Sequence, residues 1–186
     1  MARLKYAMLM SADGFVNDAS GDFEWAMPSQ EVHAYANELE SQVGTFLYGR
    51  RMYELMRVWQ EWPDSLDEPQ EVLEYADIWR AARKIVISST LDEVTTPLTE
   101  LRSSLSADDL RALKDSSDRD LSISGPTLAA SALKAGLVDD ITLIAVPVLV
   151  GAGTRALPDG VRLDLELVSS RTFNNGTVAT HYRQAQ

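Results

Sequence analysis

The chain has 186 residues, 45% of them hydrophobic and 24% charged, and this size and balance predict one globular domain over residues 1–186. It contains no cysteine and only two histidines, which lie far apart, so disulfides and thiolate metal sites are excluded and no metal is expected. The formal net charge of −11 disfavours nucleic acid as a partner, because phosphates need a basic face.

The N-terminal quarter predicts a strand, a long loop and a helix. Residues 3–10 alternate like a strand and lack the apolar core of a signal peptide. No stretch of the chain approaches the roughly 20 apolar residues of a membrane span, so we expect a cytoplasmic protein. Residues 13–25 form a long, glycine-containing loop of a kind that often carries function. Ser29 can cap the helix that follows, whose apolar residues recur at helical spacing from Val32 to Val43.

The rest of the chain predicts further strands and helices in alternation. We expect strands over residues 45–48, 84–88, 121–124, 141–150, 162–173 and 177–183. We expect helices from about Arg50, from Pro69 at a first helical position, from a Ser106 cap to Lys114, and over 127–135 with Gly136 just beyond the end.

This order of elements predicts an α/β fold with a mostly parallel sheet flanked by helices and a C-terminal antiparallel hairpin. Asn175-Gly176 is a strong hairpin turn, and Leu163, Leu165 and Leu167 of the strand before it are expected to face inward. Because ligands of such sheets bind at the carboxyl ends of the strands, the loops after strands are the candidate sites.

Three strand-to-loop junctions combine glycine, hydroxyl or arginine residues. At the first, Gly49 permits a tight turn, and Arg50 and Arg51 add positive charge to a helix start that attracts phosphate. At the second, Ser88-Ser89-Thr90 offers hydroxyls to a ribose or a 2′-phosphate. At the third, Ser124-Gly125-Pro126-Thr127 opens a helix whose first turn can receive a pyrophosphate. The first and third junctions are equally compatible with an ordinary capped turn, and for the hydroxyl run, taken alone, that simpler interpretation is favoured.

Several established motifs are absent. No G-x-G-x-x-G follows a strand, which excludes a standard Rossmann site, and no G-x-x-x-x-G-K-[ST] or G-x-S-x-G sequence indicates a P-loop or a serine hydrolase. Residues 150–154 (VGAGT) have no clear helix after them, so they are interpreted as a strand-end loop that can approach a ligand.

As a set, the junctions resemble the dihydrofolate-reductase-like superfamily. More closely, the chain is similar to the bacterial group that shares the C-terminal reductase domain of the bifunctional riboflavin deaminase-reductase. The resemblance covers nearly the whole chain and rests on SADGF (11–15), LYGRRMY (47–53), KIVISSTL (84–91), AGLVDD (135–140) and VPVLVGAG (146–153).

The resemblance implies NADPH as hydride donor and commonly a homodimer. It implies a cofactor site formed by Gly49, Arg50, Arg51, Met52, Ser88, Ser89, Thr90, Ser124, Gly125, Pro126 and Thr127. In the family two glycines usually precede the pyrophosphate helix, whereas Ser124 and Gly125 stand here. The loop over residues 13–25 is implied to cover the nicotinamide and the substrate.

The candidate catalytic residues are Asp13, Gln30 and His33, and the candidate substrate residues are Trp25 and Tyr53. Folate reductases carry an acid in a Trp-x-x-Pro-x-acid frame, and residues 25–30 match the frame with Gln30 in the acid's place. A neutral amide cannot hold charge against a protonating pterin, so dihydrofolate is a poor substrate. His33 can meet a substrate phosphate or donate a proton, or it is simply half-exposed on its helix.

The preferred function is NADPH-dependent reduction of a small heterocyclic or carbonyl compound, similar to 5-amino-6-(5-phosphoribosylamino)uracil reductase of riboflavin biosynthesis. Three alternatives remain open: a nucleotide-binding dimer without turnover, a dihydrofolate reductase, and a structural dimerisation module that uses residues 141–150 and the terminal hairpin. We expect a homodimer, because these segments can leave apolar surface for a second copy to cover.

Overall fold

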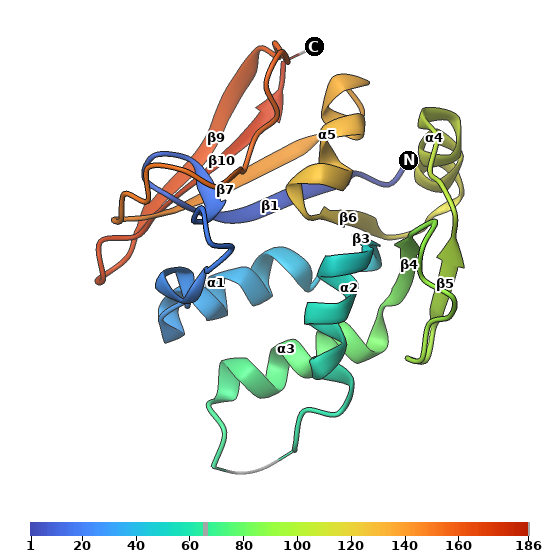
Figure 1. Cartoon of the computed structure of the whole chain (residues 1–186), viewed down its shortest axis with the longest axis horizontal. Coiled ribbons are helices and arrows are strands. Elements are labelled where there is room, and N and C mark those ends of the chain that lie inside the picture. The colour runs from blue at the N-terminus through green and yellow to red at the C-terminus, as the bar shows by residue number, and fades with distance from the viewer. Residues whose placement is uncertain (65–66, 186) are drawn as a thin grey trace.

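The computed structural model describes residues 1–64 and 67–185 and is built around a sheet of eight strands (Figure 1). Its elements, in chain order, are β1 (Leu4–Ser11), β2 (Phe15–Asn17), the 3-10 helix η1 (Glu24–Ala26), α1 (Gln30–Glu40), β3 (Val43–Gly49), α2 (Arg50–Met56), the 3-10 helix η2 (Arg57–Gln60), α3 (Gln70–Ala81), β4 (Arg83–Ile87), β5 (Thr99–Arg102), α4 (Ala107–Ser116), β6 (Asp120–Ser124), α5 (Pro126–Lys134), β7 (Asp140–Val146), β8 (Thr154–Arg155), β9 (Leu165–Thr172) and β10 (Val178–Gln184).

The strands of the large sheet lie in the order β5-β4-β3-β6-β1-β7-β10-β9. Every neighbouring pair from β5 to β7 is parallel, whereas β10 runs antiparallel to both β7 and β9. The predicted fold class is therefore confirmed. A second, two-stranded sheet pairs β2 with β8, which joins the loop after β1 to the loop after β7.

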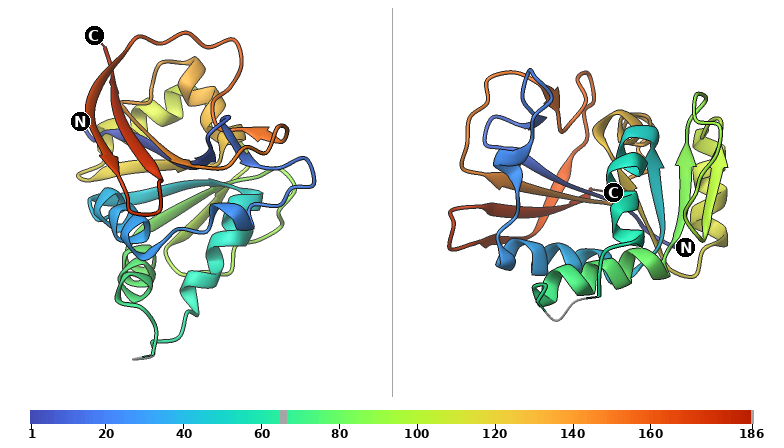
Figure 2. Two further views of the ribbon diagram at one scale, coloured as in Figure 1. Left: turned by 90° about the vertical axis from the view of Figure 1, so that its left-hand side faces the viewer. Right: turned by 60° about the horizontal axis from the view of Figure 1, so that its bottom comes forward.

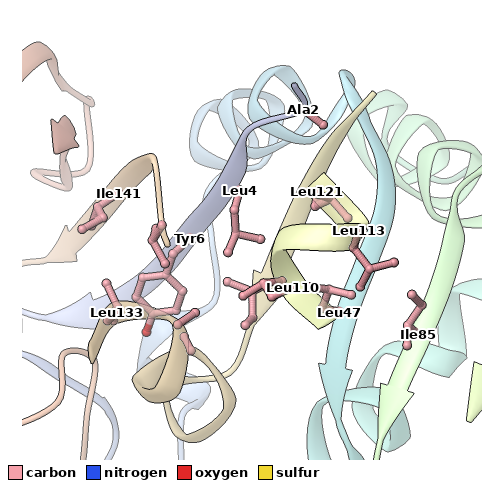
Figure 3. Close-up of a cluster of buried hydrophobic side chains, with 14 residues drawn as sticks. Ala2, Leu4, Tyr6, Leu47, Ile85, Leu110, Leu113, Leu121, Leu133 and Ile141 are labelled. Carbon is pink, nitrogen blue, oxygen red and sulfur yellow. The ribbon is translucent and has the colours of Figure 1, made fainter. Parts of the chain in front are cut away.

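Helices cover both faces of the sheet, with α4 and α5 on one side and α1 and α3 on the other (Figure 2). Successive side chains of β1 point to opposite faces of the sheet. Leu4 and Tyr6 therefore share one face, and both are fully buried in the cluster that includes residues of α4 and α5. Figure 3 shows this cluster, to which Leu110, Leu121 and Leu133 also belong. Each fully buried side chain of this kind contributes about 1.5–3 kcal/mol to folding.

The predicted ends of two helices are confirmed. α4 begins with a capping box, in which the Ser106 hydroxyl accepts from the backbone N–H of Asp109 at 3.1 Å and the Asp109 carboxylate accepts from that of Ser106 at 2.8 Å. α5 ends before Gly136, whose φ of 63° is the left-handed conformation of a helix terminus.

Several expected elements differ from the structure. The strand expected over 141–150 ends at Val146, because Pro147 has no N–H to continue the ladder. The helix expected to begin at Pro69 begins one residue later, with Pro69 as its N-cap. The edge strand β5 was not expected, because it is short and mostly polar, and the loop over 13–25 contains β2 and η1.

The inward orientation expected for three leucines before the hairpin turn is confirmed for Leu163, which packs against the buried cluster of Figure 3, and is wrong for Leu165 and Leu167. β9 is exposed along its whole length, and Leu165 and Leu167 have 38% and 60% of their surface accessible. β9 lies at the edge of the sheet beside β10, beyond the strands that the helices cover (Figure 1). Alternation identified a strand correctly but did not show whether anything covers it.

Candidate functional site

The three junctions identified in the sequence meet at one edge of the sheet. They follow β3, β4 and β6, which are neighbours in the order β4-β3-β6. Gly49 is paired in register with Ile87, and Tyr48 with Ser124, so the loops leave the sheet at the same level. Segments separated by up to about 80 residues of sequence are therefore brought together at the carboxyl ends of parallel strands, where ligands of α/β sheets bind.

Arg50 ties the first junction to the second. Its Nε atom donates to Glu54 Oε1 at 2.8 Å, and its Nη1 atom donates to the carbonyl and hydroxyl oxygens of Thr90 at 3.3 and 3.2 Å. A side chain placed on Gly49 would find no atom within 4 Å, so the space above this turn is open. Arg51 is exposed beside it.

The hydroxyl run forms a tight turn. Ser88 Oγ accepts from the backbone N–H groups of Thr90 and Leu91 at 3.2 and 3.0 Å, which places Ser88 in a supporting role within the loop. Ser89 and Thr90 are exposed and remain accessible to a ligand.

The third junction contains the backbone conformation that glycine favours. Gly125 is the N-cap of α5 with φ 93°, and Pro126 occupies the first helical position. A Cβ at Gly125 would lie 3.9 Å from Met52 Cβ, so α2 packs closely over this turn. Thr127 is exposed and borders an open depression of about 420 Å³. The lining residues are Phe15, Pro126, Thr127, Ala130, Gly153, Thr154, Arg155, Leu157, Pro158 and Asp159.

Asp13 fastens the loop after β1 to the loop after β7. Its carboxylate accepts from the backbone N–H groups of Val150 and Gly151 at 3.2 and 2.7 Å. A hydrogen bond from the Ser11 side chain, together with these backbone bonds, lowers the pKa of Asp13 below its usual value. A carboxylate held ionised in this way can stabilise the contact between the two loops, but it does not fit the role of proton donor.

The start of α1 carries the other candidate catalytic residues. Gln30 is exposed at the first position of the helix. His33 is half-buried one turn later, with its ring centroid 6.0 Å from that of Trp59 and 5.7 Å from that of Tyr75. Burial lowers the pKa of His33 below 6.5, so the imidazole is neutral at neutral pH. Trp25, in η1, is half-buried and donates from its indole nitrogen to the carbonyl of Asp22 at 3.2 Å.

Tyr53 does not lie open to a substrate. Its side chain is 2% exposed and its hydroxyl accepts from the backbone N–H groups of Thr95 and Thr96 at 3.0 and 3.3 Å. The sequence predicted that Tyr53 contacts the substrate. In the structure its hydroxyl instead stabilises the segment before β5 through these hydrogen bonds.

Within residues 1–64 and 67–185, no helix is both long enough and apolar enough to cross a bilayer. The same part of the chain holds no group of three or more His, Asp or Glu side chains arranged to bind a metal ion.

The sequence profile of the RibD C-terminal domain matches residues 2–179. The chain belongs to the RibD C-terminal domain family. It is 25% identical over 182 residues to the Bacillus subtilis (strain 168) protein YyaP, itself uncharacterized, and the match covers 97% of this chain and 94% of YyaP. A protein from Shewanella sp. PV-4 whose name relates it to riboflavin biosynthesis has a similar structure, with a TM-score of 0.77, 21% identity and full coverage of both chains.

Two-domain relatives share the fold as part of a longer chain. The deaminase/5-amino-6-(5-phosphoribosylamino)uracil reductase of Thermotoga maritima matches with a TM-score of 0.69 and 17% identity over 99% of this chain and 57% of its own. Acinetobacter baumannii RibD matches with a TM-score of 0.73 and 13% identity over 100% of this chain and 58% of its own. Family membership indicates a reductase-type protein whose fold suits a nicotinamide cofactor.

Two features of this candidate site were missed or misjudged from the sequence. Arg155 borders the depression, with its guanidinium carbon 5.0 Å from the Phe15 ring centroid, and only its basic charge in an acidic chain distinguishes it in the sequence. Gly153 meets protein backbone, because a Cβ there would lie 1.9 Å from the carbonyl oxygen of Asn17. That glycine permits the close approach of the loops after β1 and β7.

Proposed function

We propose that the protein is an NADPH-dependent reductase of a small heterocyclic or carbonyl compound. The chemistry would resemble that of 5-amino-6-(5-phosphoribosylamino)uracil reductase, the activity named for the Thermotoga maritima relative. The observation that carries the proposal is the convergence of the loops after β3, β4 and β6 at one edge of a RibD-type sheet. We further propose that this single domain acts in the cytoplasm.

The residues at this edge fit a phosphorylated dinucleotide. Arg50 and Arg51 supply positive charge beside the exposed hydroxyls of Ser89 and Thr90, a combination suited to a 2′-phosphate. Gly125, the N-cap of α5, has no side chain, which suits the close approach of a pyrophosphate to the start of the helix. The depression that begins at Thr127 supports extension of the ligand toward Phe15.

When bound, NADPH supplies the hydride, and the protein's own residues position the reactants. Asp13 would hold the loops after β1 and β7 together, and the segment over residues 13–25 would shield the reaction from water. Neither the ionised Asp13 nor the neutral His33 is a good proton donor, so the proton would come from water.

We also propose that the protein is a homodimer formed through its C-terminal hairpin. Leu165, Leu167, Val168 and Val178 are exposed by 38, 60, 45 and 36%, and apolar surface of this extent on neighbouring strands favours an interface. Because the same strands occur in every copy, a two-fold arrangement would bury them in pairs. Light scattering that gives the mass of one 20.6 kDa chain at micromolar concentration would contradict this.

Turnover tests the proposed reaction. Loss of NADPH absorbance is followed with a panel of pyrimidines, pterins and small carbonyl compounds, each measured against a reaction without protein. At least one compound is expected to be reduced, with product formed in equal amount to the NADPH consumed. Tight binding of NADPH without oxidation by any compound of the panel would instead favour a nucleotide-binding protein.

A further inference from the structure

A cavity of about 280 Å³ lies at the edge of the sheet opposite the candidate cofactor site. Lys5 near the start of β1, Asp120 at the start of β6 and Asp140 at the start of β7 line it. Because these strands are parallel, the three residues mark their amino ends, whereas the loops of the candidate site leave from the carboxyl ends. Glu38 and Glu40, in the last turn of α1, also line the cavity. It is therefore a second pocket, separate from the site described above.

The carboxylates of the strand residues already have partners. Asp120 Oδ1 accepts from the backbone N–H of Arg3 at 3.0 Å, and Asp120 Oδ2 lies 2.9 Å from Lys5 Nζ. The side chain of Asp140 is only 7% exposed, with Oδ1 2.8 Å from His181 Nε2 and Oδ2 2.5 Å from Arg3 Nε. Since each oxygen of both carboxylates has a partner, these two side chains provide little for a further hydrogen-bond donor.

The cationic side chains of the same cavity have unused donors. Arg3 and Arg183 approach Asp140 through Nε, at 2.5 and 3.5 Å. Within residues 1–64 and 67–185, the Nη atoms of these two guanidinium groups donate no hydrogen bond. Lys5 directs one of its three N–H groups to Asp120. The three side chains are 36%, 48% and 24% exposed for Arg3, Arg183 and Lys5, so their free N–H groups can reach a ligand.

The two carboxylates of α1 oppose an anion only weakly. Glu38 Oε2 lies 3.6 Å from Arg171 Nη1, which offsets its charge. Glu40 accepts from the Ser122 hydroxyl at 3.1 Å, and its Oε2 atom is buried. Burial raises the pKa of Glu40 to about 7, so part of this carboxyl is protonated at neutral pH. The hydrogen-bonding capacity that remains in the cavity is therefore mainly that of N–H donors.

We propose that this cavity binds a small anionic compound through a carboxylate or phosphate group, held by Arg3, Lys5 and Arg183. Guanidinium and ammonium groups bind such oxygens with short, charge-assisted hydrogen bonds. Ala7 and Leu39 line the same cavity and can contact a short carbon skeleton. At about 30 Å³ for each water-sized group, the cavity has room for roughly nine such groups, which is enough for a small organic acid and too little for a dinucleotide. The inference does not depend on the proposed reductase function.

A matched pair of ligands tests the charge requirement. Succinate and its uncharged diamide, succinamide, have the same size, and calorimetry measures the binding of each to the full-length protein in a buffer of low ionic strength. Inorganic phosphate is titrated in parallel. At least one of the two anions is expected to bind about tenfold more tightly than succinamide, because hydrogen bonds to charged groups contribute more than neutral ones. The tighter anion identifies the group, and saturating NADPH is expected to leave its affinity unchanged.

Two variants locate the bound anion. Arg183→Gln, at an exposed position near the end of β10, is expected to weaken binding of the anion about fivefold or more, because it removes a charged donor. Arg162→Gln is the matched control, since it removes the same charge from a side chain that is 91% exposed and lies outside the cavity, and its affinity should equal that of the wild type. Failure of both anions to bind at millimolar concentration overturns the inference. Equal binding of succinamide, displacement of the anion by NADPH, or unchanged binding to Arg183→Gln also overturns it.

Discussion

Glu40 should make the stability of the protein depend on pH. It is the last residue of α1, and its Oε1 atom accepts from the Ser122 hydroxyl at 3.1 Å. The residue is partly exposed, but its Oε2 atom is buried and has no hydrogen-bond partner among the described residues. Burial raises the pKa of Glu40 to about 7, and the bond from Ser122 and the charge of Lys5 offset only part of this rise.

The sign follows from proton binding in the two states. The carboxyl of Glu40 binds its proton more tightly in the native state than in the unfolded state, where its pKa is near 4.5. Its contribution to the unfolding free energy is therefore fully present below pH 4.5 and is lost as pH rises to about 7. At about 1.4 kcal/mol for each tenfold change in proton affinity, the loss amounts to roughly 3 kcal/mol. Glu40→Gln keeps an acceptor for Ser122 and removes the ionisation, so it should stabilise the protein by about 2 kcal/mol at pH 8.

Denaturant unfolding of the wild type and the variant at intervals from pH 4.5 to 8.5 measures the effect. The difference in unfolding free energy should grow as pH rises and level off above pH 7, with a melting temperature roughly 4–8 °C higher for the variant at pH 8. Glu38→Gln, two residues earlier on the same helix and exposed, is the control and should give a difference that does not vary in this way. A Glu40→Gln difference that is constant with pH, or that shrinks as pH rises, would refute the reasoning.

Three further changes test other parts of the account. Lys84 is fully buried, donates to the carbonyl of Trp79 at 3.1 Å, and has a pKa that burial lowers to about 8. Lys84→Met should therefore raise the unfolding free energy by about 1–2 kcal/mol below pH 8, because it removes a buried charge. In unfolding measurements this gain should shrink as pH rises toward 10, because the native lysine is then already neutral. Gly125→Ala and Gly136→Ala each force a side chain into a positive φ and should each cost about 1 kcal/mol, but calorimetry should find weaker NADPH binding only for Gly125→Ala; equal loss of affinity in both would remove Gly125 from the site. The wild type should not measurably reduce dihydrofolate, because Gln30 stands where an acid would contribute about 10²- to 10⁴-fold in rate, and brisk methotrexate-sensitive turnover would show that this frame is misaligned.

Local signals in the sequence were sufficient for most of the fold. The Ser106 cap, the glycine after α5 and the apolar runs of β1, β4 and β6 act over a few residues, and the structure has them where they were expected. The errors arose where tertiary context decides. Whether Leu167 is covered depends on the neighbours of β9 in the sheet, and the short polar strand β5 is stabilised by pairing with β4.

The candidate site was predictable as a set of junctions, because the order of strands and helices alone sends these loops to one edge of a parallel sheet. The hydrogen bonds and the burial of each side chain at the site were not predictable. The commitment of Asp13 to two backbone N–H groups joins residues about 137 positions apart, and the burial of Tyr53 depends on the segment before β5. Such contacts leave no local signal in the sequence.

Cofactor preference tests the central claim most directly. The melting temperature of the full-length protein is measured with increasing NADPH and, separately, with increasing NADH. NADPH at 100 times its dissociation constant should add about 2.7 kcal/mol of stability, and NADH at the same concentration should add less, because it lacks the 2′-phosphate that Arg50 and Arg51 would meet. An unchanged melting temperature with both nucleotides would contradict the account.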